Sequence, residues 1–175
     1  MKQARARGVL VTVLGIAALA AGLAASQQWI EVASDEGAIS VMMPCVPPWK
    51  SEWVPRGNAP SGYRSHIALC KAADETYLVG WVDYEPGYAP NVQAELEANG
   101  DNFVNGMQAQ LLTTTNTTWQ GFPALEFTAR RGDTHDITSR VVMKATRPYQ
   151  LAVLTPAGQH RSANIDRFMA SQRLK

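Results

Sequence analysis

Histidine and cysteine, which carry most metal and redox chemistry in proteins, are scarce here: three and two of 175 residues. The sequence has no C-x-x-C, H-x-x-H or H-E-x-x-H spacing, which excludes the common thiol-redox and zinc motifs. It also lacks a G-x-S-x-G elbow, a phosphate loop, a G-x-G-x-x-G turn and an S-x-x-K motif. We therefore expect no catalytic residues, no cofactor and no metal site.

Acidic residues are absent before Glu31, and this absence defines the N-terminal segment. Lys2, Arg5 and Arg7 precede an uncharged run over 8–25, the pattern of an export signal whose positive end stays in the cytoplasm. As a helix the run would be about 27 Å long, close to the roughly 30 Å of a bilayer core. Residues 1–26 are therefore either a cleaved signal peptide or a retained transmembrane anchor, and both place residues 27–175 in the periplasm as a single domain.

A retained anchor would have two further features. Small residues at Gly8, Gly15, Ala18 and Gly22 would permit close packing against other membrane helices. Three residues separate the apolar run from Trp29, which would lie at the membrane interface.

The sequence also lacks a large excess of either charge. Removal of the three N-terminal cations leaves 13 basic against 15 acidic residues, so the net charge falls from +1 to −2. The remaining cations form no helical stripe, and we expect no nucleic-acid partner.

Apolar residues alternate along most of the domain. Period-two stretches predict strand pairs at 29–32 with 38–43 and at 63–71 with 76–84, then strands at 113–118, 124–131, 136–146 and 149–155. Strand 76–84 has apolar residues on both faces, which indicates an interior position. Helical spacing from Val92 to Leu111 predicts one helix, and Ser162 is suited to cap a second. The predicted fold is α+β: an antiparallel sheet flanked by helices, after one N-terminal apolar helix.

Residues 44–62 break this pattern, with five prolines and two tryptophans. Such a segment cannot form a helix or a central strand, so we expect a long loop. Long loops in compact domains are often functional, which makes Trp49, Lys50, Trp53 and Arg56 candidates for a partner-contact surface. The alternative is that the tryptophans fold back and cover an edge of the core.

Cys45 and Cys70 bracket this segment. An isolated pair in an oxidising compartment favours a disulfide, which would stabilise the fold by about 3.5 kcal/mol in the chain-entropy model. A redox or metal role is less favoured, because neither cysteine has a histidine nearby in sequence.

Polar residues elsewhere admit mainly structural interpretations. Asp83 and Glu85 share one strand face, where solvation at a strand end is favoured over calcium binding or acid–base work. His66, His135 and His160 are expected at the surface or bonded locally. The tripeptide at 131–133 reads as a hairpin turn, because glycine supplies positive φ.

Several stretches together resemble a broad set of exported bacterial domains similar to PsbP, the extrinsic subunit of photosystem II. They are Trp29 with 36–44, 77–84, Gly121–Glu126, the strand of Arg140, Arg147–Leu151 and the closing 166–171. The resemblance covers Trp29 to Leu174 and rests on structural motifs of low specificity. Cys45 and Gln172 depart from it, since such domains often have glycine at the first position and an aromatic residue at the second.

The resemblance implies a PsbP-like α/β/α sandwich, without catalytic residues to transfer. It favours a membrane-anchored, non-catalytic accessory subunit of a membrane protein complex, photosynthetic or respiratory, that contacts complex subunits and, through an uncleaved helix, the lipid bilayer. The alternative is a soluble secreted periplasmic module that binds a ligand or protein. An enzyme of unrecognised type is the third and least favoured hypothesis.

Overall fold

The computed structural model describes residues 28–34, 38–55 and 62–175, so the expected anchor residues Gly8, Gly15, Ala18 and Gly22 lie outside the described residues. In the described part of the chain the elements are β1 (Ile30–Ala33), β2 (Ile39–Met43), β3 (Trp49–Pro55), β4 (Gly62–Ala72), β5 (Glu75–Tyr84), α1 (Val92–Gly106), β6 (Gln110–Trp119), β7 (Phe122–Arg131), β8 (His135–Lys144), β9 (Arg147–Pro156), α2 (Ala163–Ala170) and β10 (Arg173–Leu174). The α+β class is confirmed.

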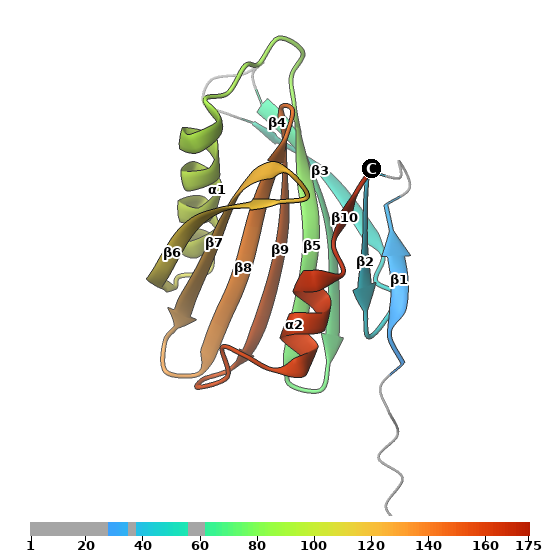
Figure 1. Ribbon diagram of the computed structural model, residues 1–175, viewed down its shortest axis with the longest axis vertical. Helices are drawn as coiled ribbons and strands as arrows, with labels where there is room; N and C mark the ends of the chain where they lie inside the picture. The colour runs from blue at the N-terminus through green and yellow to red at the C-terminus, as the bar shows by residue number, and fades with distance from the viewer. Residues whose placement is uncertain (1–27, 35–37, 56–61) are drawn as a thin grey trace, which may run out of the picture.

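The main sheet has seven strands in the order β3-β4-β5-β9-β8-β7-β6, and every neighbouring pair is antiparallel (Figure 1). Strand β5 lies in its interior, as its two apolar faces predict. The turns around Ala73 and Gly132 have positive φ, which confirms the two hairpins that the sequence indicates there.

A second, three-stranded sheet has the order β1-β2-β10. The pairing of β1 with β2 was predicted, but β10 was not, because a two-residue strand has no periodicity to detect. This small sheet and α2 together cover one face of the main sheet, and α1 covers the other (Figure 1). The expected α/β/α sandwich therefore has one helical layer and one mixed layer.

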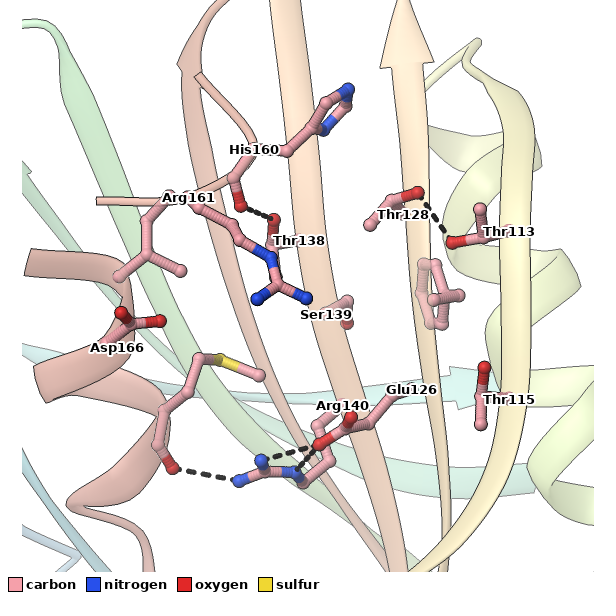
Figure 2. Close-up of a pocket in the computed structure, with 13 residues that line it drawn as sticks. Thr113, Thr115, Glu126, Thr128, Thr138, Ser139, Arg140, His160, Arg161 and Asp166 are labelled. Carbon is pink, nitrogen blue, oxygen red and sulfur yellow. Dashed lines mark hydrogen bonds and ion pairs between the residues drawn. The ribbon is translucent and has the colours of Figure 1, made fainter. Parts of the chain in front are cut away.

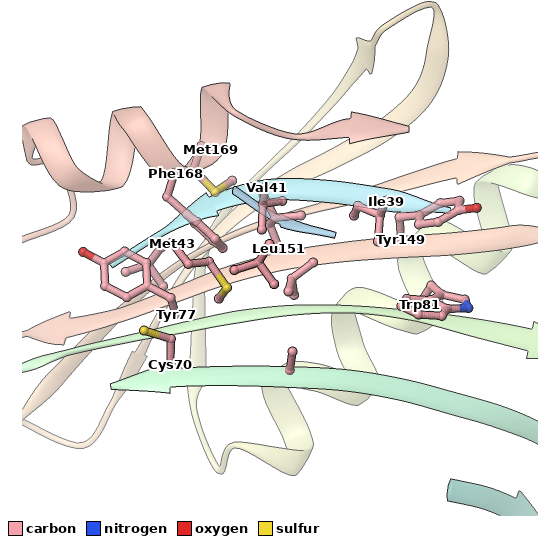
Figure 3. Close-up of a cluster of buried hydrophobic side chains, with 14 of the residues drawn as sticks. Ile39, Val41, Met43, Cys70, Tyr77, Trp81, Tyr149, Leu151, Phe168 and Met169 are labelled. Atoms are coloured by element: carbon pink, nitrogen blue, oxygen red, sulfur yellow. The ribbon is translucent and has the colours of Figure 1, made fainter. Parts of the chain in front are cut away.

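Two hydrophobic cores fill the spaces between these layers. The larger core joins the small sheet and α2 to β4, β5 and β9, with Tyr77, Phe168 and Leu151 almost completely buried (Figure 3). The Tyr77 ring meets Phe168 edge-on at 5.2 Å. The smaller core lies beneath α1, where Leu96 and Val104 pack against β7 and β8.

Helix α1 is shorter than the apolar spacing predicts. Asn91 caps its start by accepting a hydrogen bond from the Ala94 backbone N–H at 3.0 Å, and the helix ends at Gly106. Gln108 then adopts positive φ and redirects the chain into β6. Leu111 belongs to this edge strand, so its helical spacing from Met107 is a coincidence of two adjoining patterns.

The prediction of a continuous loop over 44–62 is wrong, because β3 occupies Trp49–Pro55. Pro47 and Pro48 precede the strand and Pro55 is its last residue, so no proline interrupts its interior. Strand β3 pairs only with β4, at the edge of the sheet, where missing N–H donors are tolerated. The exclusion of a central strand is consistent with this position.

Cys45 and Cys70 form a disulfide with an S–S distance of 2.01 Å. Cys45 follows β2 of the small sheet, whereas Cys70 is a completely buried residue of β4. The bond therefore joins the two sheets covalently.

Replacement of both cysteines by alanine should lower the free energy of unfolding by about 3 kcal/mol, since the unfolded chain gains the freedom of an open loop. Urea unfolding monitored by circular dichroism measures the change. The reductant dithiothreitol should destabilise the wild type by a similar amount and leave the double variant unaffected. Equal stability of the oxidised wild type and the variant would contradict this assignment.

Gln172 is completely buried, and neither polar atom of its amide has a hydrogen-bond partner among the described residues. Gln172→Met keeps the shape and removes this desolvated amide, so the free energy of unfolding should rise by about 1–2 kcal/mol. Gln120→Met is the matched control with the opposite sign. The Gln120 amide bonds the Gln172 carbonyl and the Leu174 N–H, and its loss should destabilise the protein. Thermal melts measure both, and a lower melting temperature for Gln172→Met would refute the prediction.

Candidate functional site

The layers covering the main sheet are offset from each other. Helix α1 packs on β6–β9, whereas the small sheet and α2 pack on β4, β5 and β9 from the opposite side. One half of each face is therefore left without a covering layer of secondary structure (Figure 1). The two uncovered halves differ sharply in chemistry, and they are the candidate binding surfaces.

The first is a polar groove of about 330 Å³ between α2 and the β6–β8 half of the sheet (Figure 2). Threonines from three strands line this groove, namely Thr113, Thr115, Thr128 and Thr138. Thr113 and Thr128 share a 2.7 Å hydrogen bond, and Thr138 donates to the His160 carbonyl at 3.1 Å. Hydroxyl groups tolerate water, so this half-face needs no cover.

Arg140 forms one end of the polar groove, and its guanidinium is bonded to neighbouring protein groups (Figure 2). Its guanidinium donates to Glu126 at 2.8 and 2.6 Å and to the Met169 carbonyl at 2.8 Å. It also lies 3.7 Å from the centroid of Trp119. These contacts tie β8 to β7, to the end of α2 and to the last residue of β6, so Arg140 is a structural residue.

The second is an apolar groove beside α1, over the β4–β5 half of the sheet. It comprises two adjoining cavities of about 580 and 200 Å³ that share Ile67, Leu78 and Phe103. Leu69 in its floor is 47 % exposed, although its register partner Leu78 is almost buried. Leu69 and the half-buried Ile67 leave apolar side-chain surface open in this groove, as is typical of a surface that binds something.

The larger cavity ends in two cations, Lys71 and Arg131, with His135 beside them. The described residues that line the two cavities include no carboxylate. Lys71 pairs in register with Thr76, and Arg131 pairs with His135, which places the cations near the same ends of their strands. The apolar groove therefore has a positively charged end and an opposite end that no described Lys or Arg lines.

Glu95 fixes the N-terminal half of α1 at the other end. This buried carboxylate accepts hydrogen bonds from the Tyr84 hydroxyl, from the Tyr88 hydroxyl at 2.8 Å and from the Asn99 amide at 2.9 Å. Burial, with the adjacent Glu95 charge, raises the pKa of Tyr84 well above its ordinary value. The tyrosine therefore remains a neutral donor that holds α1 against β5.

Ser51, His66 and Asp83 form a linear array across β3, β4 and β5 that sequence inspection could not find. Ser51 Oγ lies 2.8 Å from His66 Nδ1, and His66 Nε2 lies 3.1 Å from Asp83 Oδ2. Asp83 is also ion-paired with Arg147 at 2.5 Å, and the His66 ring stacks on Trp81 at 4.3 Å. Because Arg147 balances the charge of Asp83 and Trp81 holds the His66 ring by stacking, we interpret the array as a set of structural polar contacts between strands.

The residues expected to contact partners differ in how exposed they are. Trp49 donates from Nε1 to the Ala33 carbonyl at 3.0 Å and packs against Trp81, so it covers the core edge. Trp53 is 44 % exposed and Lys50 is exposed, which leaves both available to a partner. Arg56 lies outside the described residues.

Trp29 does not occupy the interfacial position expected for it. It is only 8 % exposed, meets Tyr77 edge-on at 5.5 Å and lies under the Arg167 guanidinium. Its indole ring is large enough to fill the space between β1 and β5, so burial in the core outweighs an interfacial role.

Neither metal ligation nor membrane spanning has a candidate in the part of the chain that the structure describes. Residues 28–34, 38–55 and 62–175 contain no cluster of three or more potential metal ligands. No helix within these ranges is long and apolar enough to cross a bilayer.

Glu85, which was expected to share a strand face with Asp83, accepts a hydrogen bond from the Gly62 backbone N–H at 2.5 Å.

The fold matches that of a known protein, although the sequence does not. The solution structure of cyanobacterial PsbP (CyanoP) from Synechocystis sp. PCC 6803 superposes with a TM-score of 0.51 over 88 % of this chain and 96 % of that chain. The two sequences are 13 % identical, so the likeness shows a PsbP-like fold alone. No family model and no curated protein matches the sequence.

Asp136 is the buried acid of the domain's second ion-pair network. Arg130 donates to it at 2.8 Å, the Gly158 N–H at 2.6 Å, and His160 Nε2 lies 3.2 Å away. The hydrogen bond from Arg130 lowers the pKa of Asp136, and burial opposes this only in part. The pKa of Asp136 is lower in the folded chain than its unfolded value of about 4. The ionised carboxylate therefore stabilises the fold above about pH 4, and this stabilisation is lost as pH falls through the folded pKa.

Asp136→Asn should therefore lower the free energy of unfolding by about 2 kcal/mol at pH 7. The difference from wild type should shrink as pH falls below about 4, because the unfolded wild-type chain then binds a proton that the native Asp136 carboxylate does not. Urea unfolding at several pH values measures both effects. Asp133→Asn, in the exposed β7–β8 turn, should change little at any pH. A pH-independent difference for Asp136→Asn would contradict the linkage.

Proposed function

We propose that the protein is a non-catalytic accessory subunit of a membrane protein complex, held outside the cytoplasmic membrane by residues 1–26. The described domain is a PsbP-like fold stabilised by a disulfide, and disulfides are typical of extracytoplasmic compartments. The exposed Trp53 and Lys50 on edge strand β3 are the residues that we assign to partner contact.

The observation that carries this proposal is the burial of Trp29. Only Ser26, Gln27 and Gln28 separate the apolar run from this residue, and three extended residues span about 10 Å. Because Trp29 is packed in the core, the connection to an anchor cannot lengthen without withdrawing Trp29 from the core. A domain held so closely above a membrane has little freedom to search for soluble partners and suits a fixed place in an assembly.

Lengthening this connection should separate membrane retention of the protein from its assembly into a complex. We expect the full-length protein to stay in membranes after a high-salt wash and to co-migrate with a larger assembly on a native gel. Insertion of 12 Gly/Ser residues between Gln27 and Gln28 should keep membrane retention but weaken co-migration, because the domain is no longer positioned. The same insertion after Gly132, in a surface turn, is the control and should leave co-migration unchanged.

Two outcomes would contradict the proposal. An intact mass showing cleavage near Ala25, with free monomer in the soluble periplasmic fraction, would favour the alternative of a soluble binding module. Covalent labelling of Ser51 by a fluorophosphonate, abolished by His66→Ala, would show that the array on β3–β5 is catalytic.

A further inference from the structure

We propose that the apolar groove beside α1 binds one acyl chain of a monomeric anionic amphiphile, a long-chain carboxylate. The hydrocarbon chain lies over Ile67, Leu69 and Leu78, and the carboxylate meets Lys71 and Arg131. This ligand site goes beyond the proposed docking role and lies entirely within the described domain.

The first argument is the contrast between the two uncovered half-faces. The α2 side of β6–β8 presents threonines to solvent, whereas the α1 side of β4–β5 presents the exposed Leu69 and the half-buried Ile67 beside the buried Leu78. Both half-faces belong to one sheet and both lack a covering layer. Solvation alone would favour hydroxyls on each, so the aliphatic row indicates an apolar occupant.

The second argument is shape. The groove runs along β5 from Thr76 to Val82, six residue steps or about 20 Å at strand spacing. One leaflet of a bilayer core is about 15 Å thick, half of the total, so the groove is long enough to hold one extended acyl chain. Its larger cavity, about 580 Å³, lies in the usual size range of small-molecule sites.

The third argument is charge. Lys71, Arg131 and His135 lie at the Thr76 end, and Val82 and Pro148 line the opposite end. A ligand that is anionic at one end and apolar along its length matches this polarity. A neutral oil would leave the cations unused, and an apolar peptide helix would bury them without a partner.

The fourth argument is position relative to the chain entry. Trp29 packs on Tyr77, the register partner of Cys70, and the next pair along the hairpin is Thr76 with Lys71. The cationic end of the groove and the start of the domain therefore lie at the same end of the sheet, on opposite faces. In a tethered protein this end is close to the bilayer, the source of long-chain carboxylates.

Photo-crosslinking tests the site in the full-length protein in its native membranes. The probe is a 16-carbon fatty acid with a diazirine near its methyl end, and mass spectrometry locates the adducts. We expect adducts on the peptides of β4, β5 and α1 that line the groove. Adducts spread evenly over the domain would overturn the proposal.

Leu69→Glu places a carboxylate in the floor and should reduce labelling by at least about tenfold. Leu111→Glu is the matched control, since Leu111 is 42 % exposed on the far edge strand and lies outside the groove. Thermal melts check that both variants fold. Equal labelling of the two variants would refute the site.

The head-group assignment has its own test. Lys71→Glu combined with Arg131→Glu should reduce labelling by the carboxylate probe several-fold and increase labelling by the corresponding 16-carbon amine. Unchanged preference for the carboxylate would overturn the assignment of the cationic end. Labelling that requires a diacyl phospholipid probe instead would show that the groove contacts the bilayer itself and would refute a monomeric ligand. Loss of complex co-migration with labelling retained would reject the docking role alone.

Discussion

The offset between the layers on the two faces of the main sheet determines most other features of this domain. A seven-stranded sheet is too wide for one helix to cover, and α1 reaches only β6–β9. The small sheet and α2 cover β4, β5 and β9 from the other side. Strand β9 is consequently sandwiched on both faces, as its nearly continuous apolar residues require, and each outer half of the sheet is bare on one side.

The two bare halves differ in composition although neither is covered by secondary structure. Threonine has high strand propensity and a hydroxyl that water can solvate, so it maintains β6–β8 without a partner. The exposed Leu69 and the half-buried Ile67 on β4 cost hydration free energy while they stay uncovered. Glu95 and its two tyrosines hold α1 in place, so the helix forms a fixed wall of the apolar groove.

The local pattern predicted nearly every long strand, because period-two alternation is a direct consequence of the sheet having two faces. It failed where tertiary pairing decides the structure. The prolines suggested a loop over 44–62, but they stand at the ends of β3, and only its edge position makes them compatible with a strand. Strand β10 is too short for any pattern. The array of Ser51, His66 and Asp83 depends on the register of three strands, and the grooves depend on which half of each face is covered; neither is contained in local spacing.

The small sheet is connected to the main sheet by more than apolar packing. Here β1 pairs with β2, β2 leads to Cys45, and the disulfide continues to Cys70 in the interior of β4. Trp29 adds an apolar contact with β5 beside the same bond. The N-terminal strand is therefore connected to the main sheet through a strand ladder, a covalent bond and a buried ring.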